Sequence, residues 1–88
     1  MVRLRIERHK RYPHEAVSRQ VEGRVTVHFR ITGSGAVRDV SIAKTSRHRA
    51  LDEAALTAVR NAAPFPTPPS RFFRGEVALN ITIVFELT

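Results

Sequence analysis

The chain contains 88 residues, a length that fits one small domain. It has no cysteine, which excludes a disulfide framework and a thiolate metal site, and no apolar run approaches the roughly 20 residues that span a bilayer. The net charge is +7 and the apolar fraction is 42%, so we expect a folded domain with a basic surface that attracts anionic partners.

The first ten residues are expected to form a basic lead-in from a linker, with the folded domain occupying residues 11–88. Much of the positive charge lies near this end, on Arg3, Arg5, Arg8, Lys10 and Arg11. Alternate residues from Val2 to Ile6 are apolar, which would also suit a short edge strand. Tyr12-Pro13 marks the boundary. Because proline is well tolerated in the first turn of a helix, a short helix is expected over His14 to Gln20.

Two strands joined by a tight reversal are expected next. Apolar and polar residues alternate over Arg24 to Thr32, which is the period of a strand with one buried face. Gly33-Ser34-Gly35 supplies the reversal, because glycine accepts the positive φ that hairpin turns require. The chain returns over Val37 to Thr45, where Val37 is out of phase with the apolar positions that follow, and this predicts a β-bulge or a late entry of this strand into the ladder.

The period changes to that of a helix over Arg47 to Ala63. The apolar stripe of this helix consists of Leu51, Ala55, Ala58, Val59 and Ala62. A proline-rich loop over Ala63 to Gly75 ends the helix. One ring of Phe72-Phe73 is expected to pack under that loop, and the alternative is an exposed pair, flanked by arginines, that contacts a partner. The last strand, Glu76 to Leu87, alternates more regularly than any other segment. Its apolar face consists of Val77, Leu79, Ile81, Ile83, Phe85 and Leu87.

The order helix, strand, strand, helix, strand predicts a two-layer α+β domain. The hairpin makes the first two strands antiparallel neighbours, and the helical crossover returns the last strand parallel to the second. The first strand still has one unpaired edge, and the last strand is expected to pair with it. We therefore expect a three-stranded antiparallel or mixed sheet in the order 2-1-3, packed on two helices that lie on one face.

The two edges of this sheet differ in sequence. The second strand is short and contains Arg38 and Lys44, charges of the kind that protect an edge from pairing with another chain. The last strand has no lysine, arginine, proline or glycine after Gly75. This edge suits the addition of an extended segment from a partner. The alternatives are that another part of the chain covers it, or that it pairs with its own copy in a homodimer.

The segments in their order resemble the C-terminal domain of the TonB family. The matching segments are Tyr12-Pro13, Glu22-Gly23-Arg24-Val25-Thr26-Val27-His28-Phe29, Gly35-Ala36-Val37-Arg38-Asp39-Val40, Leu51-Asp52-Glu53-Ala54-Ala55-Leu56 with Ala58-Val59, and Phe65-Pro66. The resemblance covers roughly Arg11 to Phe85, which is nearly the whole chain. Its specificity comes from the conjunction of the segments, since glycine hairpins and alanine-rich helices are common individually.

The resemblance implies a non-catalytic interaction domain in the periplasm, anchored to the inner membrane through an N-terminal part of the full-length protein. Members of the family capture the TonB box, a short extended segment of a TonB-dependent outer-membrane receptor, by β-strand addition. They work with an ExbB/ExbD-type inner-membrane complex, and they transmit energy from the proton-motive force for the import of nutrients such as siderophores or haem. No cofactor, metal or nucleic acid is implied.

Two groups of site residues follow from the resemblance. The pairing strand would consist of Val77, Ala78, Leu79, Asn80, Ile81, Thr82, Ile83, Val84 and Phe85. A second segment, expected to lie near the receptor, would consist of His9, Lys10, Arg11, Tyr12 and Pro13. Family members often have glutamine just before the tyrosine-proline pair, where this chain has His9, Lys10 and Arg11.

Catalysis and nucleic-acid binding are the alternatives from other classes. The four histidines are dispersed, and Asp52 and Glu53 complement a helix dipole rather than form an acid–base pair. Arg24, His28 and Arg30 could form a basic stripe on the open face of the sheet, as in a small RNA-binding domain. That face offers no aromatic stacking platform, so we expect this second function to be the weaker candidate.

Overall fold

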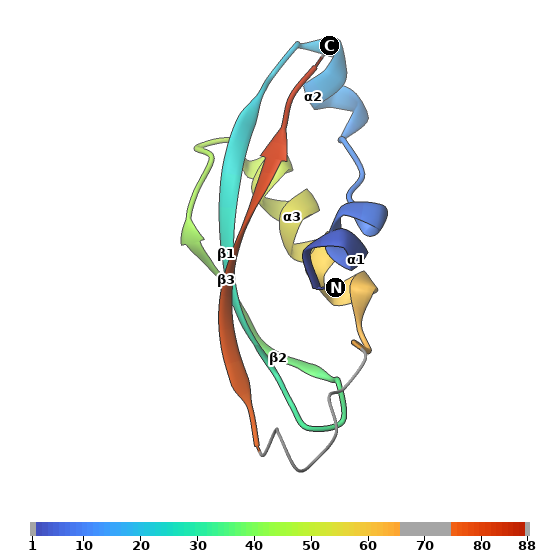
Figure 1. Cartoon of the computed structure of the whole chain (residues 1–88). Coiled ribbons are helices and arrows are strands. Elements are labelled where there is room, and N and C mark those ends of the chain that lie inside the picture. Colours follow the sequence, from blue (N-terminus) through green and yellow to red (C-terminus); the bar gives the residue numbers. More distant parts are fainter. Residues whose placement is uncertain (1, 66–74, 88) are drawn as a thin grey trace.

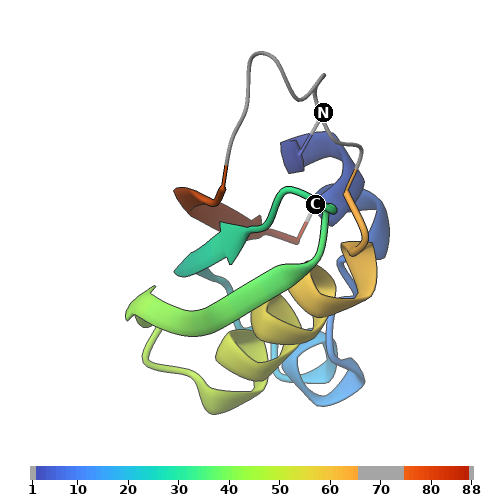
Figure 2. The same cartoon turned by 90° about the horizontal axis from the view of Figure 1, so that it is seen from below.

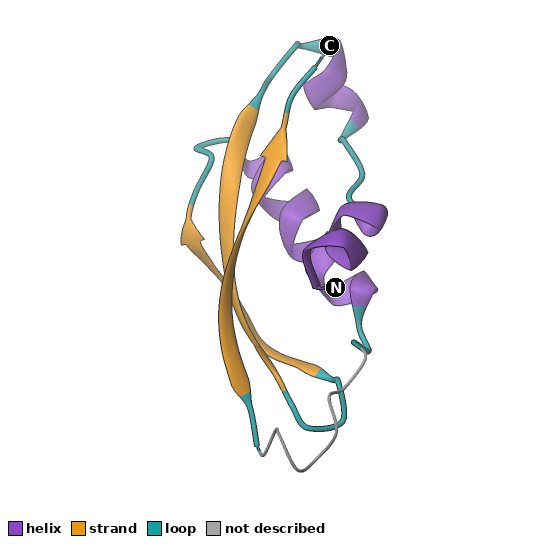
Figure 3. Ribbon diagram, viewed as in Figure 1, coloured by secondary structure: helices purple, strands orange, loops and turns teal. Residues whose placement is uncertain are grey.

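The computed structural model describes residues 2–65 and 75–87, which form a helix layer on one face of a small sheet (Figures 1 and 3). The elements in chain order are α1 (Val2–His9), α2 (His14–Ser18), β1 (Gly23–Ile31), β2 (Val37–Lys44), α3 (Arg49–Ala62) and β3 (Val77–Phe85). This is the two-layer α+β architecture that the sequence predicts.

The sheet has the order β2-β1-β3, and both pairings are antiparallel, so the predicted 2-1-3 order is confirmed. The β1–β3 ladder is continuous from Gly23 opposite Phe85 to Ile31 opposite Val77. It therefore joins the two most regularly alternating segments of the chain over their whole length.

The β1–β2 ladder is interrupted where the sequence predicts a bulge. His28 pairs with Ser41 and Arg30 with Arg38, so two steps along β1 match three along β2. Asp39 lies in this interval with a φ of 55°, in the left-handed region that a bulged residue can adopt. A second register shift lies at the other end of the same pair of strands. β2 is thus irregular at two places.

The core lies between β1, β3 and α3. Val25, Val27 and Phe29 of β1 are fully buried, as the alternation predicts. The stripe of α3 that faces them is also fully buried, and its alanines let the helix lie close to the sheet (Figure 2). The apolar face of β3 is covered only toward its end, where Ile83 and Phe85 are buried, while Val77 at its start is 37% exposed.

The N-terminal segment forms a helix, which corrects the expectation of a lead-in or edge strand. Val2 and Ile6 are four residues apart, so a helix places both on one face, whereas Leu4 is left 55% exposed. Ile6 is fully buried. Arg5 Nε donates to the carbonyl oxygen of Ala62 at the end of α3, at 2.7 Å. The alternation of apolar residues was compatible with either structure, and the burial of Ile6 against the core favours the helix.

The hairpin between β1 and β2 is fastened to the end of α3. Gly35 has a φ of +91°, and a Cβ at this position would lie 2.2 Å from the carbonyl oxygen of Phe65. The Phe65 N–H donates to the Gly35 carbonyl at 2.8 Å, and the Phe65 ring stacks on Phe29 with centroids 6.1 Å apart. The glycine turn predicted from the sequence therefore also packs against the backbone of Phe65. Phe72 and Phe73 lie outside the described residues.

Candidate functional site

The outer row of β3 can be assigned from side-chain pairs across the β1–β3 ladder. Thr26 and Thr82 lie opposite each other with their hydroxyls 2.9 Å apart, and His28 Nδ1 lies 2.8 Å from Asn80 Oδ1. Side chains approach most closely at the non-hydrogen-bonded pairs of an antiparallel ladder, whose N–H and C=O groups point away from the partner strand. The residues of β3 whose backbone N–H and C=O groups point away from β1 are therefore Ala78, Asn80, Thr82 and Val84.

Two basic side chains from the N-terminal segment contact this outer row. Arg3 Nη1 donates to the carbonyl oxygen of Thr82 at 2.8 Å, and Lys10 Nζ donates to that of Val84 at 2.8 Å. Both acceptors belong to the row assigned from the side-chain pairs, so two independent observations agree. Within residues 2–65 and 75–87, no strand pairs with this edge.

Lys10 is held in place by two further contacts. Its ammonium lies 3.1 Å from the carboxylate of Glu7 and 5.6 Å from the centroid of the Phe85 ring. The structure thus brings together Lys10, Val84 and Phe85, which the sequence assigned to two separate groups of site residues. Arg3 was not among the predicted residues, because in the sequence it is one of several arginines in a segment expected to be solvated.

Tyr12 links the segment before α2 to the end of β3. Its hydroxyl donates to the carbonyl oxygen of Val21, and its ring meets Phe85 edge-on, with centroids 5.4 Å apart and an interplanar angle of 80°. Partial burial, together with the carboxylate of Glu22, raises the pKa of the Tyr12 hydroxyl above its usual value. Pro13 precedes the first turn of α2. His9 and Arg11 are exposed to solvent.

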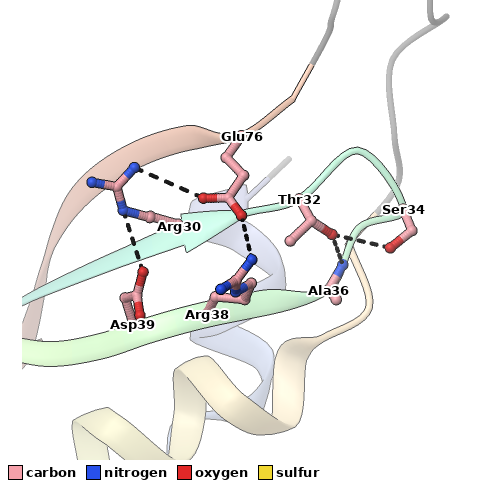
Figure 4. A network of polar contacts seen from close by, with 7 residues as sticks. All are labelled: Arg30, Thr32, Ser34, Ala36, Arg38, Asp39 and Glu76. Atoms are coloured by element: carbon pink, nitrogen blue, oxygen red, sulfur yellow. Dashed lines mark hydrogen bonds and ion pairs between the residues drawn. The ribbon is translucent and has the colours of Figure 1, made fainter.

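Charged residues tie the opposite end of β3 to β1, its neighbour, and to β2, the strand beyond it (Figure 4). Just before β3, Glu76 accepts a hydrogen bond from Arg38 Nη1 at 2.8 Å and lies 3.8 Å from Arg30 Nη1. Arg30 Nε also lies 3.4 Å from a carboxylate oxygen of Asp39. These four side chains lie on the face of the sheet opposite the helices. They fix the start of β3 without covering its outer row of backbone groups.

These contacts also involve the basic stripe of Arg24, His28 and Arg30, the alternative site for nucleic-acid binding. Arg30 is paired with two carboxylates, and His28 is hydrogen-bonded to Asn80. Of the three stripe residues, Arg24 is left as an exposed cation. Because Arg30 is neutralised by carboxylates, the stripe offers a phosphate backbone little more than the single charge of Arg24. The open face of the sheet therefore does not favour nucleic-acid binding.

Asp52 holds the connection between β2 and α3. Desolvation acts to raise its pKa, but hydrogen bonds from the Thr45 hydroxyl and from the N–H and hydroxyl of Ser46, together with the nearby His48, outweigh this and lower the pKa. The role of Asp52 is to anchor the start of the helix. In the described part of the chain, no three histidine or carboxylate side chains gather to hold a metal, and no helix is long and apolar enough to cross a membrane.

A cavity of about 530 Å³ lies beside β2 and the end of α3, away from the β3 edge. Its lining residues are Ala36, Val37, Arg38, Asp39, Val40, Arg60, Ala63 and Pro64. Strand addition uses a row of backbone groups rather than a cavity, so this location does not conflict with an edge site on β3.

The structure defines a small two-layer α+β domain with one long, regular sheet edge that is bordered by basic side chains. The chain is a member of the family described as Gram-negative bacterial TonB protein C-terminal, whose sequence profile matches residues 8–87. This membership confirms the resemblance seen in the sequence.

Relatives and solved structures agree with the family assignment. The chain is 41% identical over 69 residues to Protein TonB of Pasteurella multocida and 34% identical over 86 residues to Protein TonB of Haemophilus influenzae. These alignments cover 78% and 98% of this chain but 27% and 31% of the two relatives. The NMR solution structure of Helicobacter pylori TonB-CTD superposes with a TM-score of 0.85 at 35% identity, covering 99% of this chain and 78% of that one.

Proposed function

We propose that this domain captures an extended segment of an outer-membrane receptor, the TonB box, by adding it as a fourth strand to the outer edge of β3. The observation that supports this most directly is the regular row of outward-facing backbone groups at Ala78, Asn80, Thr82 and Val84. The pairing strand would run from Val77 to Phe85. The segment from His9 to Pro13 would border the visiting strand, since Lys10 and Tyr12 already contact the end of β3.

For the whole protein, we propose an energy transducer anchored in the inner membrane, with this domain in the periplasm. An ExbB/ExbD-type complex would act on the part of the protein outside this sequence. The captured receptor would import a nutrient such as a siderophore or haem. The domain has no catalytic role in this scheme, since it works by holding and pulling a polypeptide.

The energetics of strand addition suit a reversible contact. About five new backbone hydrogen bonds at roughly 1 kcal/mol net each would give about 5 kcal/mol. Docking costs of at least about 4 kcal/mol oppose them, so side-chain contacts and charge steering supply the surplus. We expect micromolar affinity. A paired strand that is pulled along its length loads several hydrogen bonds together, so modest affinity is compatible with the transmission of force.

Titration of the isotopically labelled domain with short peptides from receptor N-termini tests the proposal. Backbone amide shifts concentrated on Val77 to Phe85 are the expected result. The matched control is the same peptide with alternate backbone amides N-methylated, which removes hydrogen bonds while keeping the side chains. If no box-like peptide shifts these amides, or if the methylated peptide binds equally well, strand addition is wrong.

The same edge could pair with its own copy, which we propose as the alternative use of this surface. The row on β3 is self-complementary in an antiparallel arrangement, because each residue offers one donor and one acceptor. Size-exclusion chromatography with light scattering distinguishes the two uses. A concentration-dependent dimer that the receptor peptide dissociates would show that the two compete for one edge.

A further inference from the structure

The outer row of β3 is divided into two halves by its contacts with α1. The acceptors toward the end of the strand, Thr82 O and Val84 O, each receive a hydrogen bond at 2.8 Å from a basic side chain of the N-terminal segment. The half toward the start differs. Across the described parts of the chain, no side chain hydrogen-bonds to the backbone of Ala78 or Asn80. A visiting strand therefore meets free groups at one end and occupied acceptors at the other.

α1 is held between the core and this edge. On one side, Ile6 is buried and Arg5 Nε donates to the Ala62 carbonyl at 2.7 Å. On the other side, Arg3 and Lys10 reach β3. The helix lies on the β3 side of the helix layer, next to α3 (Figure 2). An isolated helix of eight residues is marginal in water, so α1 depends on these contacts to stay in place.

A strand that pairs with all of β3 needs the same two acceptors. In an antiparallel or parallel ladder, each outward carbonyl of the edge strand accepts an N–H from the incoming chain. The Arg3 guanidinium and the Lys10 ammonium already donate to the Thr82 and Val84 carbonyls. A carbonyl oxygen has two lone pairs, but a second donor competes with the first for the same oxygen and weakens both hydrogen bonds. Full docking therefore competes with the present position of these two side chains.

We infer that α1, through Arg3 and Lys10, is a latch on the receptor-docking edge of β3; this inference rests on the proposed function. The visiting segment pairs first with Ala78 and Asn80 and then replaces the Arg3 guanidinium and the Lys10 ammonium with its own N–H groups. The two side chains are released to solvent or to carboxylates of the partner. Removing the latch contacts therefore strengthens peptide binding, although it also removes two positive charges.

The test uses the full chain and compares two double variants of equal charge. Arg3→Gln with Lys10→Gln removes both latch contacts, whereas Arg8→Gln with Arg19→Gln removes two exposed charges from outside the edge. The receptor peptide is expected to bind the first variant about tenfold more tightly than the wild type and the second variant with unchanged or slightly lower affinity. Circular dichroism and thermal unfolding confirm that both variants fold.

A second variant gives an independent measurement. Arg5→Gln removes the contact between α1 and the end of α3 but leaves Arg3 and Lys10 in place, so it loosens the latch from its other side. We expect tighter peptide binding here too, by about threefold. In the wild type, amide shifts on α1 should appear at the same peptide concentrations as those on Thr82 and Val84.

The outcomes separate the latch from the proposed function. If the peptide shifts β3 while the affinity of the Arg3/Lys10 variant is unchanged or weaker, the latch is overturned and strand docking stands. Weaker binding would show that these cations attract the segment rather than exclude it. If no peptide shifts β3 in the wild type or in either released variant, strand docking is wrong and the latch loses its purpose with it.

Discussion

The two outer strands of the sheet, β2 and β3, differ in how readily their unpaired backbone groups can pair with another chain. β2 departs from regular pairing at two places, places Asp39 at a positive φ and carries Arg38 and Lys44. β3 pairs with β1 without interruption over nine residues and contains no charged side chain from Val77 to Phe85. An irregular, charged strand resists the addition of another chain, and a regular, uncharged one permits it. The contrast supports the proposal that a partner strand adds to β3 rather than to β2.

The open edge is bordered by side chains rather than by a strand. Arg3 and Lys10 occupy single carbonyl oxygens, whereas a strand would occupy donors and acceptors along the whole row. Such contacts can be exchanged one at a time. We therefore infer that β2 is protected permanently from the addition of another strand, because its backbone is irregular. The protection of β3 by side chains is reversible.

The largest expected effect concerns the hairpin that holds β2. Gly35→Ala forces a side chain into a left-handed position and against the Phe65 carbonyl, so we expect it to lower the free energy of unfolding by about 3 kcal/mol. Gly33→Ala is the matched control, because the nearest atom to its added Cβ lies 3.7 Å away. Chemical denaturation measures both. Equal losses in the two variants would show that Phe65 does not fasten this turn.

The next prediction concerns a variant that blocks the outer edge of β3, so that neither edge of the sheet accepts a strand readily. Asn80→Pro deletes an outward N–H and places a ring where the visiting strand must lie, while β1 keeps its hydrogen bonds because proline is tolerated on an edge strand. We expect a loss of peptide affinity of about 30-fold, or about 2 kcal/mol, with the fold retained. Asn80→Ala keeps the N–H and should bind within about twofold of the wild type. Comparable weakening by both variants would assign the effect to the lost contact with His28.

The connection that leads out of β2 depends on an ionised carboxylate. The pKa of Asp52 is lowered in the folded state. Its contribution to the free energy of unfolding is therefore complete above the usual aspartate pKa of about 4, and it is lost as the pH falls through the lower folded-state pKa. Asp52→Asn should lower stability by about 1.5 kcal/mol at pH 7 and by much less near pH 2. Urea denaturation at both pH values checks this. Glu53→Gln, at an exposed neighbour, should show little effect at either pH.

The smallest effect is expected where the start of β3 is tied to β2. Glu76→Gln weakens ion pairs with Arg38 and Arg30, whose side chains are 61% and 45% exposed. We expect a loss of about 0.5 kcal/mol at low ionic strength, disappearing near 1 M salt because of screening. Thermal unfolding at the two salt concentrations measures it. A loss that persists at high salt would mean that Glu76 acts through hydrogen-bond geometry rather than charge.

Much of the fold followed from the sequence because its signals were local. The period of two gave β1 and β3, the glycine reversal gave the hairpin, and the alanine stripe gave α3. The out-of-phase Val37 located the bulge to within a few residues. These features depend on neighbours in the chain, so composition and spacing were enough to predict them and, with the rules for connecting strands, the sheet order.

The N-terminal helix and its contacts could not be predicted in this way. Apolar residues at Val2, Leu4 and Ile6 fit a strand by alternation and a helix by the spacing of Val2 and Ile6, and only the burial of Ile6 distinguishes the two. Arg3 looked like a linker charge, and Lys10 was a predicted site residue only through the family resemblance. Their contacts with β3 could not be predicted, because the acceptors lie more than 70 residues away in the chain. The predicted edge residues occupy the positions expected of them, and their role in binding stays a prediction.

The most direct test of strand addition to β3 is the structure of the domain bound to a receptor peptide, determined from intermolecular NOEs. Strand addition predicts NOEs from the peptide backbone to the N–H groups of Ala78, Asn80 and Thr82, in the regular spacing of a fourth strand, with α1 displaced from Thr82 and Val84. NOEs confined to β2, or to the cavity between β2 and α3, would contradict it.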